Sequence, residues 1–252
     1  MKRVLVIGIG AGDPEHITAQ AAAALNRTDV LLVVDKGEAG AGADLAAVRD
    51  AILERFLGAD RAPRRVDIPE ISRDRAPTDY EATVDAWRAA RVAAYAAAIA
   101  QVGEDETAAF LVWGDPAIYD GTVSLLDELR TTIDFELDII PGVSAATALA
   151  AAHRVPLNQV GESILFTTGR RLRERGIPDS VDNVVVFLDA GETWRTLDVD
   201  ADIWWGAFLA TDDEVLVAGR LADVRDEIAE VRAEARDRKG WMFDTYLLRV
   251  RR

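Results

Sequence analysis

The sequence contains no cysteine, which excludes disulfide bonds, thiolate nucleophiles and cysteine-ligated metal sites together. Histidine is nearly absent as well, because His16 and His153 are the only two. An isolated histidine is more often a packed or surface residue than a ligand, and we assign neither one a role. We therefore expect no metal site, and acid–base chemistry falls to carboxylates, tyrosines or bound water.

Long apolar runs are also missing. The apolar run nearest the N-terminus covers residues 4–9 and ends in glycines, whereas a helix that spans a membrane needs about 20 apolar residues. Lys2 and Arg3 lead directly into this run, which does not have the pattern of a signal peptide. We expect no membrane association and a location in the cytoplasm.

Lysine is scarce, and acidic residues are in excess. The chain has 29 basic and 44 acidic residues, a net charge of −15, and its only lysines are Lys2, Lys36 and Lys239. An acidic surface disfavours nucleic-acid binding, because phosphate contacts need positive charge. The preference for arginine is explained either by coding bias on a solvated surface or by bidentate recognition of ligand carboxylates. Composition does not decide between the two.

A chain of 252 residues is long enough for two domains, and its first part has the pattern of an α/β fold. Short apolar runs alternate with segments of helical spacing. We expect strands at residues 4–7, 30–34, 66–68, 107–112 and 135–140, and helices at residues 18–27, 43–56, 80–101 and from 144 onward. This alternation predicts a mostly parallel sheet with helices on both faces.

A domain boundary is expected near Pro156–Gly161, which divides the chain into residues 1–158 and 159–252. In the second domain we expect an amphipathic helix at residues 221–236, and strands at residues 163–167, 184–188, 204–209, 215–218 and 242–250. The connections are shorter here, so the second domain is predicted to be α/β with a mixed sheet.

Three glycine-bearing turns follow strands of the first domain. They are Gly8–Pro14 (GIGAGDP), Trp113–Tyr119 (WGDPAIY) and Pro141–Thr147 (PGVSAAT). Because ligands bind beyond the carboxyl ends of parallel strands, we expect these turns to meet at one edge of the sheet. Taken singly, each turn is better explained as a tight connection, in which Asp115 caps the second turn and Ser144 is the N-cap in the third.

The first turn does not fit a dinucleotide-binding fold. The pattern G-x-G-x-x-G needs glycine where Asp13 stands, and Gly12 falls one position early. A carboxylate at this point would face the pyrophosphate. Asp35, at the end of the second strand, occupies a position like that of the acidic residue that binds ribose in such folds. A dehydrogenase therefore stays an alternative, although Asp13 disfavours it.

In order, spacing and type, the three turns resemble those of the tetrapyrrole (corrin/porphyrin) methylases. The segments Ile68–Arg75, Asp79–Glu81 and Val84–Arg91 further resemble a branch of that family that methylates precorrin-5 at C1 and releases an acyl group as acetate. The resemblance implies S-adenosylmethionine as methyl donor, S-adenosylhomocysteine as product, a homodimer, and an active site in the cleft between two domains. Ala11 departs from the proline that many members have at this position.

The resemblance also implies which residues bind the donor. The backbone around Ala11, Gly114, Asp115 and Ile118 is expected to meet its methionine and ribose portions. Ser144 and Ala145 are expected to line the same cleft, and Leu188 and Ala210 to flank the adenine, so the full predicted set is Ala11, Gly114, Asp115, Ile118, Ser144, Ala145, Leu188 and Ala210.

Methyl transfer depends chiefly on alignment of the reacting atoms, but release of acetate needs an activated water. Asp13 is the candidate base, and capping of the next turn explains it equally well. A substrate rich in carboxylates needs a locally positive cleft, for which Arg170 and Arg171 are the first candidates, because they follow a strand–glycine turn. A second candidate cluster contains Arg73, Arg75, Arg88 and Arg91, and surface decoration is the alternative for each arginine.

Other functions remain open. The nearest is another precorrin or uroporphyrinogen-III methyltransferase of the same fold. A methylase of a modified histidine or of a ribose in ribosomal RNA is more distant, and the acidity of the chain argues against RNA. A nucleotide-binding module without chemistry is the alternative of a different class.

Overall fold

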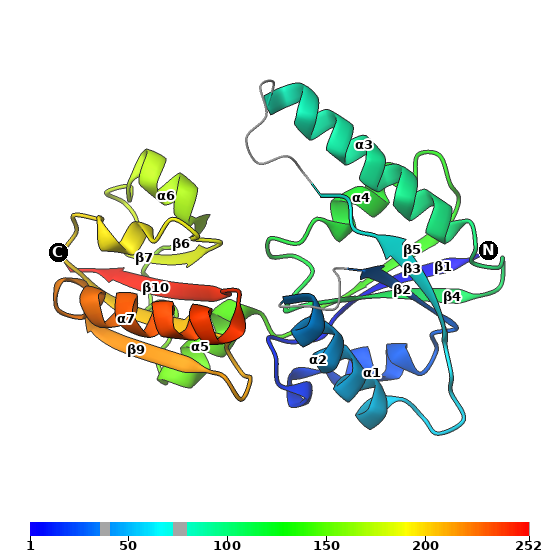
Figure 1. Ribbon diagram of the computed structural model, residues 1–252, viewed down its shortest axis with the longest axis horizontal. Helices are drawn as coiled ribbons and strands as arrows, with labels where there is room; N and C mark the ends of the chain where they lie inside the picture. Colours follow the sequence, from blue (N-terminus) through cyan, green and yellow to red (C-terminus); the bar gives the residue numbers. More distant parts are fainter. Residues whose placement is uncertain (36–40, 73–79, 252) are drawn as a thin grey trace. The chain divides into compact units, whose positions relative to one another are not determined.

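A computed structural model of the protein describes residues 1–35, 41–72 and 80–251 (Figure 1). The chain forms two compact units, each with its own five-stranded sheet. Unit 1 comprises Met1–Gly10 and Pro14–Val143, and unit 2 comprises Ala11–Asp13 and Ser144–Arg252. Both units are α/β, as predicted.

Unit 1 alternates strands and helices along the chain, as its sequence pattern predicts. Its elements are β1 (Arg3–Gly8), the 3-10 helix η1 (Pro14–His16), α1 (Ala19–Leu25), β2 (Val30–Asp35), α2 (Ala41–Phe56), β3 (Arg64–Pro69), α3 (Tyr80–Ile99), β4 (Thr107–Val112), α4 (Thr122–Leu129) and β5 (Glu136–Ile140). The short helix α4 is the one of these α-helices and strands that the sequence pattern did not predict.

The sheet of unit 1 is parallel throughout, with the strand order β3-β2-β4-β1-β5. In Figure 1, α1 and α2 cover one face of this sheet, and α3 and α4 cover the other. Successive residues of β1 enter opposite cores: Leu5 and Ile7 pack with residues of α1 and α2, and Val4 and Val6 with residues of α3 and α4. This arrangement confirms the predicted parallel sheet with helices on both faces.

Unit 2 has a mixed sheet, as predicted. Its elements are α5 (Ala145–His153), β6 (Ile164–Thr168), α6 (Gly169–Arg175), β7 (Asn183–Phe187), the 3-10 helix η2 (Thr193–Arg195), β8 (Ala201–Ala207), β9 (Val215–Arg220), α7 (Leu221–Lys239) and β10 (Asp244–Val250). The strand order is β6-β7-β10-β8-β9, in which β6 and β7 are parallel and the other pairs are antiparallel. The seven-residue helix α6 was not predicted.

The sheet of unit 2 is also covered on both faces. Trp205 of β8 is fully buried in a core with Leu221 and Ile228 of α7. The next residue, Gly206, faces the opposite way, because a Cβ built there would lie 2.8 Å from Leu149 Cδ1 of α5. At the end of α5, His153 Nε2 lies 2.9 Å from the carbonyl oxygen of Trp205, and burial lowers the pKa of this histidine.

Helix α5 belongs to unit 2, although the predicted boundary assigned it to the first domain. It packs on β8, β9 and β10, so the chain divides between Val143 and Ser144 rather than after residue 158. An alanine-rich helix carries no signal in its own sequence for the sheet that it will cover.

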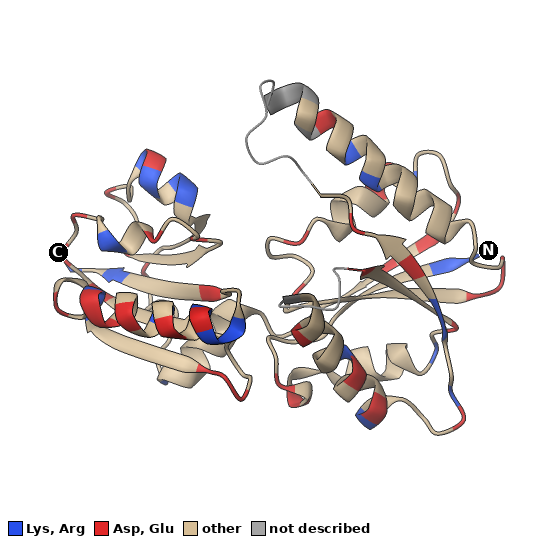
Figure 2. Cartoon of the chain, in the orientation of Figure 1, with Lys and Arg blue, Asp and Glu red and all other residues tan. Residues whose placement is uncertain are grey.

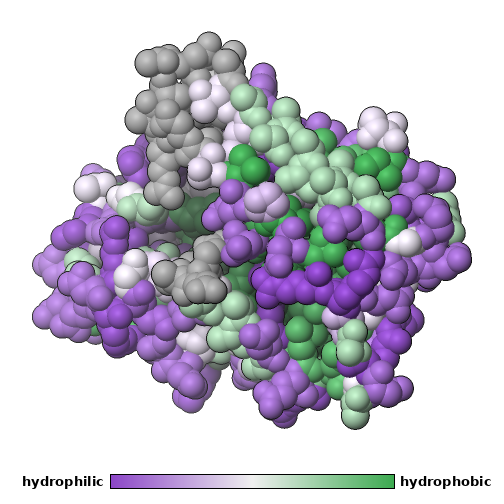
Figure 3. All heavy atoms as spheres, turned by 45° about the vertical axis from the view of Figure 1, so that its right-hand side comes forward, coloured by the Kyte–Doolittle hydropathy of each residue, from purple (hydrophilic) through white to green (hydrophobic). Residues whose placement is uncertain are grey.

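Charged residues lie chiefly on helices and connections. Acidic residues recur along α7, whose last turn is basic, and basic residues mark α6 (Figure 2). Hydrophilic side chains cover much of the face drawn in Figure 3, with paler apolar residues along α3. Within the described ranges, no helix is both long and apolar enough to cross a membrane.

Candidate functional site

The three glycine-bearing turns follow three neighbouring strands. The first leaves β1, the second leaves β4 and the third leaves β5, and β1 lies between β4 and β5 in the parallel sheet. The carboxyl ends of parallel strands lie at the same edge of a sheet, where α/β proteins bind ligands. The predicted meeting of the turns at one edge is therefore confirmed.

The backbones of these turns are in direct contact. Gly10 N–H donates to the carbonyl of Gly114 (3.3 Å), and Gly114 N–H donates to the carbonyl of Gly10 (2.7 Å). A Cβ at Gly142 would lie 2.2 Å from the carbonyl oxygen of Gly114, and one at Gly8 would lie 2.6 Å from Gly142 N. Glycine is required at these positions because the neighbouring backbone fills the space that a side chain would need.

Asp115 joins the second turn to the third. Its Oδ2 accepts a hydrogen bond from Gly142 N–H (2.9 Å), and its Oδ1 accepts one from Ala117 N–H (2.8 Å). The side chain is half-buried, and an ionised carboxylate has about four acceptor positions. Asp115 thus has a structural role and keeps acceptor capacity for a ligand. Ile118 closes the same turn through its N–H to the Asp115 carbonyl (3.1 Å).

Ser144 is buried and caps α5. Its Oγ accepts a hydrogen bond from Thr147 N–H (3.2 Å) and lies 3.1 Å from Thr147 Oγ1. Ala145 is the first residue of the helix. The N-cap that the sequence suggested as the simpler explanation of Ser144 is confirmed.

Ala11, Gly12 and Asp13 lie against the turn that follows β8. A Cβ at Gly12, whose φ is +155°, would lie 2.6 Å from Thr211 Cγ2 and 2.7 Å from the Leu209 carbonyl oxygen. Ala11 is buried and Asp13 is half-buried. Within unit 2, Gly12 thus lies next to Ala210, which was predicted to bind the donor.

Leu188 and Ala210 both have left-handed backbone conformations, with φ of 52° and 60°. Such conformations are strained in residues other than glycine and concentrate at functional sites. Leu188 follows β7 and is 58% exposed, although it is a large apolar residue. Both properties suit a residue whose side chain is covered by a ligand.

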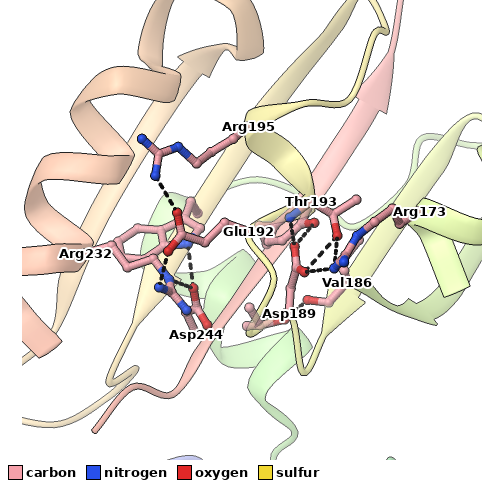
Figure 4. Close-up of polar contacts among 11 residues, drawn as sticks. Arg173, Val186, Asp189, Glu192, Thr193, Arg195, Arg232 and Asp244 are labelled. Atoms are coloured by element: carbon pink, nitrogen blue, oxygen red, sulfur yellow. Dashed lines mark hydrogen bonds and ion pairs between the residues drawn. The ribbon is translucent and has the colours of Figure 1, made fainter. Parts of the chain in front are cut away.

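Directly after Leu188, Asp189 anchors a buried hydrogen-bond network (Figure 4). Its carboxylate, which is 2% exposed, accepts hydrogen bonds from Thr193 N–H (2.7 Å), Thr193 Oγ1 (2.8 Å) and Tyr246 OH (2.7 Å). Burial, followed by the negative charge of Asp189, raises the pKa of Tyr246 well above 10.0. The network fixes the backbone that presents Leu188.

A second buried group lies beside this network. Arg232 donates from Nε to Asp244 (2.9 Å) and from Nη1 to Glu192 (2.7 Å), and Trp205 Nε1 also donates to Asp244 (3.1 Å). Burial raises the pKa of Asp244 despite these donors. Both groups were missed from the sequence, because their members are scattered along the chain.

A cavity of about 330 Å³ adjoins Leu188 in unit 2. Leu188, Trp241 and Phe243 give it an apolar wall, and Arg232, Arg236 and Asp244 also line it. A cavity that combines apolar side chains with a few polar groups is typical of small-molecule sites, and the wall formed by Leu188, Trp241 and Phe243 suits a flat heterocycle.

The predicted arginine sites have different outcomes. Arg170 and Arg171 lie on α6 and are exposed, and neither side chain makes an ion pair with a described residue. Arg88 pairs with Glu128 (2.7 Å) and so belongs to the surface. Arg73 and Arg75 lie outside the described residues. The binding roles of the predicted residues, and their position between the two domains, stay predictions.

Comparisons with known proteins agree with the resemblance seen in the turns. Residues 3–225 match the family model described as Tetrapyrrole (Corrin/Porphyrin) Methylases. A Precorrin-6A synthase (deacetylating) of Sinorhizobium sp is 43% identical over 253 residues, which covers 99% of this chain and 95% of that protein.

Comparison with solved structures also finds proteins of similar fold. A putative cobalamin synthesis related protein from Corynebacterium diphtheriae has a TM-score of 0.82 at 33% identity, covering 99% of both chains. Uroporphyrin-III C-methyl transferase from Thermus thermophilus, complexed with S-adenyl homocysteine, has a TM-score of 0.60 at 20% identity, covering 98% of this chain and 96% of that chain. The second likeness establishes the fold alone.

Replacing Gly142 with alanine is expected to destabilise unit 1, because the new methyl group would collide with the backbone of Gly114. Overpacking of this kind costs about 1–3 kcal/mol. Chemical denaturation should show the loss. Gly121→Ala is the matched control, since its Cβ would meet only Arg91 at 3.6 Å. Equal stability of the two variants would contradict the close contact.

Removing the hydroxyl in Tyr246→Phe is expected to lower the free energy of unfolding by about 1.5–3 kcal/mol, because buried Asp189 loses a donor. The folded-state pKa of Tyr246 is raised, so its contribution is complete below pH 10 and is lost as pH rises through the folded value. The difference between wild type and variant should therefore shrink above pH 10.

Tyr95→Phe is the control for this prediction. Tyr95 is also buried, but its hydroxyl makes no hydrogen bond within the described ranges. Denaturation curves at neutral and alkaline pH measure both variants. If Tyr246→Phe is as stable as Tyr95→Phe, the hydrogen bond from Tyr246 to Asp189 does not stabilise the fold.

Proposed function

Because the chain belongs to the tetrapyrrole (corrin/porphyrin) methylases, we propose that it transfers a methyl group from S-adenosylmethionine to C1 of precorrin-5 and releases acetate. The observation that carries this proposal is the 43% identity to a Precorrin-6A synthase (deacetylating) over 99% of the chain. The alternatives within the family are other precorrin or uroporphyrinogen-III methyltransferases.

The described residues fit such a donor. S-adenosylmethionine supplies an electrophilic methyl group, and its other portions are a flat adenine, a ribose and a charged amino acid. Exposed, strained Leu188 and the neighbouring cavity suit the adenine, and Ala210, which is also strained, is the second residue proposed to flank it. The remaining acceptor capacity of Asp115 suits ribose hydroxyls or an ammonium group. Ala11, Gly114, Ile118, Ser144 and Ala145 would contribute mainly backbone and small side chains.

In this mechanism the chain acts chiefly by alignment. The carbon nucleophile belongs to the tetrapyrrole, so no side chain needs to form a covalent bond. Orientation of two reactants can lower a barrier by roughly 7–11 kcal/mol. The interlocked backbones of Gly10, Gly114 and Gly142 provide a rigid support for that task.

Release of acetate needs a second step, for which Asp13 is the proposed base. Asp13 takes a proton from water, and the water oxygen bonds to the acyl carbon of the substrate. The bond between that carbon and the ring then breaks, its electron pair stays with the ring, and acetate leaves. Asp13 is half-buried at the end of the first turn.

The proposal extends to the assembly and location of the protein. A homodimer is expected from the family resemblance, and light scattering on the purified protein measures it. A cytoplasmic location is likewise part of the proposal, and fractionation of cells tests it.

The function is tested with precorrin-5 and S-adenosylmethionine labelled in its methyl group. Label at C1 with an equivalent amount of acetate is the expected result. Label at another position, without acetate, would agree with a tetrapyrrole methyltransferase but would reject methylation of precorrin-5 at C1. Asp13→Asn should still transfer label but release acetate at least tenfold more slowly, and unchanged acetate release would reject Asp13 as the base.

Arg170 and Arg171 are proposed to attract the carboxylates of the substrate. Reversing both charges, Arg170→Glu with Arg171→Glu, should raise KM for precorrin-5 several-fold and leave KM for S-adenosylmethionine unchanged. Arg175→Glu, at the far end of the same helix, is the matched comparison. An unaltered KM for precorrin-5 in the double variant would reject this role.

A further inference from the structure

The parallel sheet of unit 1 opens between two of its strands. β2 pairs with β3 at six positions, and β4 pairs with β1 at six. Between β2 and β4, however, the ladder has only two pairs, Val30 with Ala108 and Leu31 with Ala109. Beyond these pairs the two strands separate toward their carboxyl ends, which is the edge where the glycine turns lie.

Two hollows occupy this opening. One has a volume of about 600 Å³ and the other of about 300 Å³. They share the wall residues Leu32, Val34, Leu45, Arg49 and Leu111. We call the pair of hollows the strand-gap pocket. It borders the second glycine turn, because Trp113, the residue before Gly114, lines the smaller hollow.

Arg49 reaches into the strand-gap pocket from α2. Its Nη2 donates one long hydrogen bond to the carbonyl of Leu111 (3.4 Å). Its Nε is buried and has no partner among the described residues, and no described carboxylate lies within ion-pair distance of the guanidinium. Burial, followed by the charge of Arg65, lowers the pKa of Arg49. Arg49 is half-buried, and a partly desolvated cation without a counter-ion is unfavourable unless an anion binds there.

Arg91 lines the same pocket from α3. Its guanidinium lies 4.8 Å from the ring centre of Trp87 and 5.8 Å from that of Tyr95. The indole is itself held by a hydrogen bond from its Nε1 to the carbonyl of Ile71 (2.6 Å). Arg91 makes no hydrogen bond or ion pair within the described ranges, so its orientation is fixed while its donors stay available.

These two arginines differ from most others in unit 1. The arginines of unit 1 that pair with a described carboxylate are Arg3, Arg55, Arg61, Arg64, Arg65, Arg88 and Arg130. The carboxylates that line the pocket are Asp35, Asp50, Asp67, Glu70 and Asp120. Asp67 pairs with Arg65, and none of the five pairs with Arg49 or Arg91. In a chain of net charge −15, two unpaired arginines in one pocket indicate a site for an external anion.

We propose that Arg49 and Arg91 bind a carboxylate side chain of the tetrapyrrole in the strand-gap pocket. This rests on the proposed function, which supplies a substrate with many carboxylates. The apolar walls, which include Leu32, Val34 and Phe110, suit the methylene groups that carry each carboxylate. Guanidinium groups suit the carboxylate itself, because both are planar and pair through two hydrogen bonds. The same chemistry would accept free acetate, the small product of the reaction.

Thiol labelling tests occupancy directly, because the chain has no cysteine of its own. Ala94→Cys places a single thiol in the pocket wall, and Ala93→Cys places one at the neighbouring exposed position of α3. Precorrin-5, added with S-adenosylhomocysteine to prevent turnover, should slow maleimide labelling of Cys at position 94 at least fivefold and leave position 93 unchanged. Equal protection of both, or of neither, would overturn the proposal.

Adding Arg91→Gln or Arg49→Gln to Ala94→Cys should abolish the protection. Protection that survives both substitutions would overturn the role of the arginines. Sodium acetate is the comparison ligand, and protection by acetate equal to that by precorrin-5 would assign the pocket to the free product instead. Arg91→Gln is the safer variant, because Arg91 has no hydrogen bond to lose; calorimetric binding of S-adenosylhomocysteine checks that each variant is folded.

Steady-state kinetics separate this inference from the proposed function. Arg91→Gln should raise KM for precorrin-5 about tenfold while KM for S-adenosylmethionine stays unchanged, and Arg91→Lys should recover only part of the loss. If the wild-type protein transfers no label to precorrin-5, the proposed function fails. The pocket is then tested with uroporphyrin, whose side chains are all carboxylates, in the same labelling assay, where absence of protection overturns the inference as well.

Discussion

Three strand ends of unit 1 are held together by backbone alone. Gly8 and Gly142 approach the neighbouring backbone so closely that neither has room for a Cβ, and paired hydrogen bonds between Gly10 and Gly114 lock the first two turns. Asp115 then ties the third turn to the second. Ile118 is bonded to Asp115, and Trp113, which lines the strand-gap pocket, directly precedes Gly114, so both residues are positioned by that contact.

Unit 2 achieves rigidity by a different physical means. There a buried carboxylate, Asp189, orders the segment after β7 through donors from Thr193 and from Tyr246, a residue of the closing strand. A charge in the interior is tolerated only when it is fully hydrogen-bonded, so the network specifies one conformation of the loop. The outcome is an exposed leucine in a strained conformation at Leu188.

Much of the fold follows from the sequence, because alternating apolar runs and helical segments specify a parallel α/β sheet. The meeting of the glycine turns follows from that geometry, and the cap at Ser144 follows from local chemistry. The helices α4 and α6 were missed, since seven or eight residues give too short a periodicity. The Asp189–Tyr246 pair escaped because long-range packing, which no local pattern records, brings its members together. The sequence named Arg91 as a candidate, but for the same reason it did not show that Arg49 lines the same pocket.

The assignment of residues 11–13 to unit 2 has a consequence for how the chain folds during synthesis. Gly12 packs against the Leu209–Thr211 turn, so unit 2 includes a contact that spans most of the sequence. Unit 1 has all of its strands once residue 140 has been made. Unit 2 is complete only after the Leu209–Thr211 turn has been made and has packed against residues 11–13. Contacts of such separation slow folding, so a ribosome-bound chain carries a finished first unit while the second is still open. A fragment that starts at Ser144 would lack a piece of its own domain.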